Sequence, residues 1–166
     1  MTPNLRKLAL TLHVIVSVGF PGAVACFFAL AIAGMLSEDV QLVRAVYLAM
    51  DIATWLVILP LCLASLLTGL VSALGTNWGL FRHYWVLVKF LITVPSTAIL
   101  LIHLRPIEEM AEAVAQGIVS GEHFSAQLQL VAASGAALVV LLVATVLSTY
   151  KPRGMTRYGW STLREQ

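Results

Sequence analysis

The sequence predicts an all-α integral membrane protein, built as a bundle of four transmembrane helices. Of its 166 residues, 60% are hydrophobic and only 11% are charged, and the mean hydropathy is +0.92. A soluble domain of this size has too little interior to hide so much apolar surface, so lipid must solvate part of it. Four long apolar runs then supply the helices, and most charged residues fall between the runs.

The four apolar runs each reach the roughly 20 residues that a helix needs to cross ~30 Å of hydrocarbon. They cover residues 8–36, 46–74, 84–104 and 128–150, to within a few positions at each end. We therefore expect one transmembrane domain over residues 1–166 rather than several domains. The first run has no small-residue cleavage site at its end, which favours a retained helix over a signal peptide.

The charges between the runs are unevenly distributed, although the formal net charge is only +2. By the positive-inside rule, basic flanks mark the cytoplasmic side of a helical membrane protein. The rule predicts cytoplasmic N- and C-termini, a cytoplasmic loop at 75–83 and a cytoplasmic tail over 151–166. Because topology explains the basic residues, nucleic acid is not expected as a partner. The basic flanks are Arg6, Lys7, Arg82, Lys151, Arg153, Arg157 and Arg164, opposite an outer set of Glu38, Asp39, Glu108, Glu109, Glu112 and Glu122.

Two outer segments carry helix signals of their own. Ser37, followed by Glu38 and Asp39, predicts an N-cap with acidic residues in the first turn, so the second helix should begin outside its span and run into it. In the segment 105–127, apolar side chains recur at helical spacing and predict a short amphipathic helix over the mouth of the bundle. Its apolar positions are Ile107, Met110, Ala111 and Val114.

Prolines interrupt three of the four predicted spans, at Pro21, Pro60 and Pro95. A proline removes one hydrogen bond of the helix and bends it, although neighbouring helices can satisfy the freed carbonyl in a membrane. Three bent helices would leave room inside the bundle for a ligand. The alternative is that these prolines are simply tolerated in ordinary spans.

Polar side chains recur along one face of each predicted helix. At about 100° per residue, those of the third helix fall within roughly 40° of one another. Surfaces that face lipid have no use for such groups, so we expect these faces to point inward, where polar groups can pair. The positions are His13 and Ser17 on the first helix, Asp51, Trp55, Cys62, Ser65 and Gly69 on the second, Trp85, Lys89, Ser96 and His103 on the third, and Ser134, Thr145 and Ser148 on the fourth.

Depth in the membrane decides which ionisable groups can meet. His13 and Lys89 each lie about 8 Å inside the predicted cytoplasmic boundary, at 1.5 Å per residue, and are candidates for one site. Lys89 is also close enough to the boundary to extend its ammonium to the cytoplasm, which is the simpler interpretation. His103 lies roughly 20 Å further out, so it cannot share a metal ion with His13.

Asp51 lies at about the depth of His103 on the outer side, and a pair between them would offset the cost of burying either charge. Arg44 or Arg105 would serve Asp51 equally well. A metal site or a proton relay at Asp51 and His103 is the functional alternative to a structural pair. Trp85 has a simple interpretation too, because aromatic residues gather at membrane interfaces.

The residues around His13 and Lys89 resemble the CopD/HemJ-like superfamily of small bacterial four-helix integral membrane proteins. The run 8–15, LALTLHVI, is similar to the "K-x-L-H-I-I" start of that group, and the run 85–90, WVLVKF, is similar to its "W-x-x-x-K-L" motif. The resemblance extends over roughly residues 5–106, and is nearest to a family of predicted integral membrane proteins of unknown function within the superfamily.

The resemblance implies a multi-pass protein of the cytoplasmic, or inner, membrane that binds b-type haem and has a redox role. It implies that His13 is the axial ligand of the haem iron and that Lys89 is a second ligand or a partner of a haem propionate. Trp85 would then wall the pocket, and a quinone or a porphyrin would exchange electrons with the haem, as in a membrane oxidoreductase. CopD-like members are associated instead with copper uptake.

A protein without a cofactor is the competing hypothesis. It would be a membrane scaffold, a subunit that binds a partner membrane protein, or a small transporter coupled to metal ions or protons through Asp51 and His103. Glycine and alanine are plentiful in the first and fourth spans, which makes a homo-oligomer plausible, although no strict G-x-x-x-G motif occurs.

Overall fold

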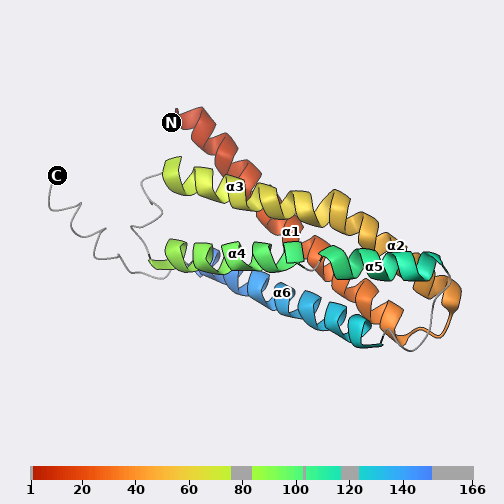
Figure 1. Ribbon diagram of the computed structural model, residues 1–166. Coiled ribbons are helices and arrows are strands. Elements are labelled where there is room, and N and C mark those ends of the chain that lie inside the picture. The colour runs from red at the N-terminus through yellow and green to blue at the C-terminus, as the bar shows by residue number, and fades with distance from the viewer. Residues whose placement is uncertain (1, 76–83, 103, 117–123, 151–166) are drawn as a thin grey trace.

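The computed structural model describes residues 2–75, 84–102, 104–116 and 124–150, and its regular secondary structure over these residues is helical (Figure 1). The predicted all-α fold is thereby confirmed for this part of the chain. Four helical segments are long and apolar enough to cross a membrane, as the sequence predicts. They are Pro3–Leu36, Val40–Leu74, Phe90–Ala115 and Phe124–Tyr150.

Two of these segments are composite. The second consists of α2, a π-helical turn η1 and α3, which follow one another without a break; the third consists of most of α4 followed by α5. Both composite segments, like α1, extend beyond the limits that hydrophobicity alone predicts. The helices are α1 (Pro3–Leu36), α2 (Val40–Ala53), η1 (Thr54–Ile58), α3 (Leu59–Gly75), α4 (Tyr84–Ile102), α5 (Leu104–Ala115) and α6 (Phe124–Tyr150).

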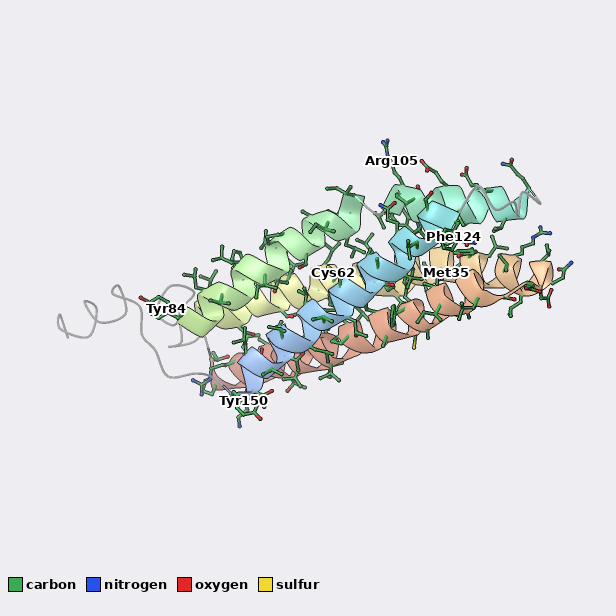
Figure 2. All side chains as sticks on the ribbon, turned by 90° about the horizontal axis from the view of Figure 1, so that it is seen from below. Met35, Cys62, Tyr84, Arg105, Phe124 and Tyr150 are labelled. Carbon is green, nitrogen blue, oxygen red and sulfur yellow. The ribbon has the colours of Figure 1, made fainter. Side chains whose placement is uncertain are left out.

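The helices form an elongated bundle with two distinct ends (Figure 1). At the end that we call basal, the start of α1, the end of α3 and the start of α4 lie together, and Figure 2 shows Tyr84 and Tyr150 there. Toward the opposite, distal end Figure 2 shows Met35 and Phe124, while Arg105 lies part-way along the bundle, where α5 begins. α1 is the central helix, because it contacts α2, α3 and α6 extensively, whereas α4 makes smaller contacts with α3 and α6.

Helix α5 confirms the predicted amphipathic pattern. Ile107, Met110, Ala111 and Val114 are its buried residues, while Glu109 is exposed. The helix lies alongside α2 and continues the direction of α4, rather than crossing the end of the bundle (Figure 1). Pairing along α2 allows each turn of the apolar face to meet apolar side chains. The buried residues of α2 are Val43, Val46, Tyr47 and Met50.

The N-terminus of α2 differs from the predicted cap by two residues. The N-cap is Asp39 rather than Ser37, and its carboxylate accepts a hydrogen bond from the backbone N–H of Gln41 at 2.9 Å. The Ser37 hydroxyl instead accepts from the backbone N–H of Asp39 at 3.1 Å. The prediction of Ser37 as the cap is therefore wrong, because the carboxylate two residues later takes the capping role and Ser37 orients it.

The buried core lies mainly where α2 and α5 pack on α1 and α6. From Phe20 onward α1 contributes buried residues, whereas Leu8, Leu12 and Ile15 nearer its start are about half exposed. In a membrane, lipid would cover these exposed leucine and isoleucine side chains. The 34 residues of α1 extend about 51 Å at 1.5 Å per residue, well beyond ~30 Å of hydrocarbon. An upright α1 is therefore longer than the hydrocarbon layer is thick.

Candidate functional site

The candidate site is a polar cluster between α1 and α3, centred on the imidazole of His13. Its Nδ1 lies 3.0 Å from Oγ1 of Thr68. The Ser17 hydroxyl lies 3.4 Å from each ring nitrogen and 3.4 Å from the Ser65 hydroxyl. All four side chains are partly buried. The structure therefore confirms that the polar faces of these two helices meet, at least at this level of the bundle.

Helical spacing and one glycine place these side chains together. His13 and Ser17 are one turn apart on α1, and Ser65, Thr68 and Gly69 share one face of α3. A Cβ atom on Gly69 would lie only 3.2 Å from Cε1 of His13. The absence of a side chain at Gly69 thus lets the ring lie directly against the backbone of α3.

The hydrogen bonds of Thr68 assign the proton of the His13 ring. The Thr68 hydroxyl donates to the backbone carbonyl of Ala64 at 2.6 Å, within its own helix. A hydroxyl has one hydrogen, so toward Nδ1 of His13 its oxygen can only accept. Nδ1 then carries the proton, and the lone pair of the neutral ring is on Nε2. A histidine that binds a metal is commonly held in this way, by a hydrogen bond from the ring nitrogen that does not coordinate.

The donor set around His13 distinguishes a haem from a bare metal ion. Structural zinc sites use four protein ligands and catalytic sites about three. In the described part of the chain, no group of three or more His, Cys, Asp or Glu side chains could hold a metal ion. A haem brings four nitrogen ligands of its own and needs only one or two from the protein. A single imidazole is thus within the number of protein ligands that a haem iron takes.

The remaining predicted members of this site belong to α4. The side chains of Trp85 and Lys89, like the whole of His103, lie outside the described residues. Their helix packs against α3 and α6. Whether Lys89 reaches the His13 cluster therefore stays a prediction, as does the pair between Asp51 and His103.

A second polar group lies at the junction of α2 and α5. Oδ1 of Asp51 is buried and has no hydrogen-bond partner among the residues that the structure describes, and Arg44 and Arg105, its predicted alternative partners, are exposed. One turn further on, the indole N–H of Trp55 donates to Oε1 of Glu108 at 3.1 Å. This bond joins η1 to α5.

The polar residues predicted to share one face of the second span lie on different faces before and after η1. Trp55 is 43% exposed and bonded to α5, whereas Cys62 is only 2% exposed, 3.4 Å from the Thr97 hydroxyl of α4. Ser65 and Gly69 contact α1. The prediction of one continuous face is wrong because η1 contains an extra residue in its turn. One residue corresponds to about 100° of rotation, so α3 presents a different face from the one that an unbroken α-helix would present.

Thr68 is a residue of the candidate site that sequence reasoning missed. The expected stripe contains Ser65 and Gly69 but not Thr68, which lies between them. Helical periodicity does not indicate Thr68. What could have indicated it is its hydroxyl group together with its place in the sequence, next to Gly69 of the stripe. Thr97, the partner of Cys62, was missed in the same way next to Ser96.

Together, the four long apolar helices and the ionisable groups inside them define the class of a multi-pass helical membrane protein. Comparisons with models of protein families, with curated proteins and with solved structures find no match. The argument for function therefore depends on the residues of this chain.

Proposed function

We propose that this chain is a multi-pass protein of the inner membrane that binds b-type haem through Nε2 of His13 and has a redox role. The hydrogen bonding of Thr68 carries this proposal, because it places the ring lone pair on Nε2. The similarity of residues 8–15 and 85–90 to CopD/HemJ-like proteins supports it independently. We also propose that the basal end, with Arg6 and Lys7, faces the cytoplasm.

Each residue of the cluster has a defined task in this proposal. Thr68 accepts from Nδ1 and holds the ring orientation, while Gly69 makes room for the ring. Ser17 is near enough to donate to Nε2 while no iron is there. On α4, Lys89 would be a second ligand or would pair with a propionate, and Trp85 would wall the pocket. A bound haem supplies one-electron chemistry, for which a quinone or a porphyrin is the partner.

The optical spectrum of the purified protein tests this proposal. We expect a Soret band, with α and β bands that sharpen on reduction with dithionite, in protein from cells supplied with a haem precursor. His13→Ala should lose these bands, and added imidazole should restore them in part, because it replaces the missing ligand. His123→Ala, which removes a histidine distant in the sequence, should keep the spectrum. A featureless visible spectrum of the wild-type protein would contradict the proposal.

A second candidate function is proton transfer through Asp51, as in a small proton-coupled transporter. The observation that favours it is the buried Oδ1 of Asp51, which has no hydrogen-bond partner. Ionisable groups at membrane depth commonly mark proton or ion pathways when no structural partner explains them. The π-helical turn η1 begins three residues further on, and such turns are frequent at functional sites.

Liposomes that enclose a pH-sensitive dye test the second candidate. We expect the wild-type protein to dissipate an imposed pH gradient faster than Asp51→Asn, which keeps the size of the side chain but cannot exchange a proton. Asp39→Asn is the matched control, because it removes a carboxylate at the exposed end of the same helix. Equal rates for the wild type and Asp51→Asn would exclude Asp51 as the proton carrier.

A further inference from the structure

The π-helical turn η1 joins two helices that are held by different partners. Before it, the backbone N–H of Thr54 bonds to the carbonyls of Asp51 and Met50, and the Thr54 hydroxyl donates to the Met50 carbonyl at 2.8 Å. After it, the N–H of Leu59 reaches back five residues to Thr54. Pro60 then has no N–H to donate. The helix is thus firmly bonded on the α2 side of the turn and weakened on the α3 side.

The packing differs on the two sides in the same way. α2 is covered by α5, and Trp55 within η1 is bonded to Glu108 of that helix. α3 instead lies against α1, through Ser65 and Gly69. If the wide turn closed to an ordinary α-helical turn, α3 would rotate by about 100° relative to α2. Each residue of α3 would then occupy the angular position of the residue that now follows it.

This rotation has a specific consequence for His13. Ala64 would face Ser17 where Ser65 now does, and Thr68 would take the place of Gly69. Because a Cβ atom at that place lies 3.2 Å from Cε1 of His13, the side chain of Thr68 would displace the ring. The imidazole therefore cannot keep its present position when the turn is closed.

The rotation would break some polar contacts and keep others. Thr68 donates to the carbonyl of Ala64 within its own helix, and it keeps this bond whichever way α3 faces. The contact between the hydroxyls of Ser17 and Ser65 would be lost, because the apolar Ala64 would replace Ser65 there. The open register is therefore the one with more polar pairing between α1 and α3.

We infer that η1 is a register switch: closing its wide turn rotates α3 by one residue against α1, which moves Gly69 away from His13 and brings Thr68 into its place. The bond between Trp55 and Glu108 holds the open register from the distal side. Breaking the bond between Trp55 and Glu108 of α5 would therefore change the surroundings of His13. It is a property of the helices alone, and only its effect on haem depends on the proposed function.

Disulfide trapping in membranes tests the switch without any cofactor. In a background of Cys26→Ala and Cys62→Ser, the pair Ser17→Cys with Ser65→Cys reports the open register, since the two hydroxyl oxygens are now 3.4 Å apart. Ser17→Cys with Ala64→Cys reports the closed register. We expect both pairs to cross-link in the otherwise unchanged chain, the first one faster.

Deleting Val57, which is 43% exposed within η1, removes the extra residue and keeps both flanking faces. In this variant we expect the open pair to cross-link as before and the closed pair to stop. Trp55→Phe should instead raise cross-linking of the closed pair several-fold, and Glu109→Gln, on the exposed face of α5, should not. Equal rates for the closed pair with and without Val57 would overturn the inference, and so would a Trp55→Phe variant that leaves the rate unchanged. The haem spectrum is measured separately, so its failure would not affect this result.

Discussion

Gly69→Ala is expected to abolish most haem binding while leaving the fold intact. The added methyl group would lie 3.2 Å from Cε1 of His13, closer than ordinary contacts allow. The imidazole, and not the backbone of α3, is the part that can move, so the ring should leave its seat beside Thr68. Haem content per protein, measured from the Soret absorbance, should fall about as far as when a group supporting a metal ligand is lost, which is about 10- to 100-fold in affinity.

Two further variants separate this effect from a general loss of packing. Gly22→Ala on α1 introduces the same methyl group where nothing lies within 4 Å, and it should leave haem content unchanged. Thr68→Val keeps the shape of the side chain but removes the oxygen that accepts from Nδ1, so it should weaken haem binding, and Thr68→Ser should restore it. If Gly69→Ala bound haem as well as the wild type, the ring seat described here would not be the haem site.

Asp51→Leu is expected to stabilise the protein. Within the described ranges of the chain, Oδ1 of Asp51 is buried without a hydrogen-bond partner, and an unsatisfied buried polar group costs about 1–3 kcal/mol. A leucine of similar size removes this cost and adds apolar contact at the edge of α2. The melting temperature in detergent should therefore rise, as measured by the loss of helical circular dichroism.

Asp39→Ala provides the opposite control on the same helix. Asp39 caps α2 and accepts from Gln41, so its loss should lower the free energy of unfolding by about 1 kcal/mol. Both variants remove one carboxylate, but the one at Asp39 is exposed and accepts a hydrogen bond, whereas an oxygen of the one at Asp51 is buried. A lower melting temperature for Asp51→Leu would show that the other carboxylate oxygen has a stabilising partner, for which His103 is the first candidate.

The sequence was sufficient to predict the parts of the fold that depend on composition and periodicity. The four spans follow from apolar length, and the buried face of α5 follows from the spacing of Ile107, Met110, Ala111 and Val114. These patterns repeat over many residues, so the hydrophobic effect determines them with little help from their neighbours. That His13 has polar partners could also be predicted, because an ionisable group deep in an apolar run needs a partner.

The η1 turn could not be predicted in the same way. An extra residue in one turn changes neither composition nor local hydrophobicity, yet it rotates everything that follows by about 100°. Which face of α3 meets His13 therefore depends on a turn stabilised by Thr54 and by tertiary contacts such as that of Trp55 with Glu108. The contact of Thr68 with His13 could not be predicted for the same reason. Periodicity alone placed Ser65 and Gly69 in one line with Asp51, and that line does not include Thr68.

The packing of α5 on α2 also sets an order for assembly during synthesis. The face of α2 that carries Val43, Val46 and Met50 is made early, but the helix that covers it ends only at Ala115. Until the ribosome has passed that residue, α1 can pack on α2 but α5 cannot cover these side chains. Lipid, or a factor that assists insertion, must shield them in the interval, so a chain truncated before α5 should be retained by such factors or degraded.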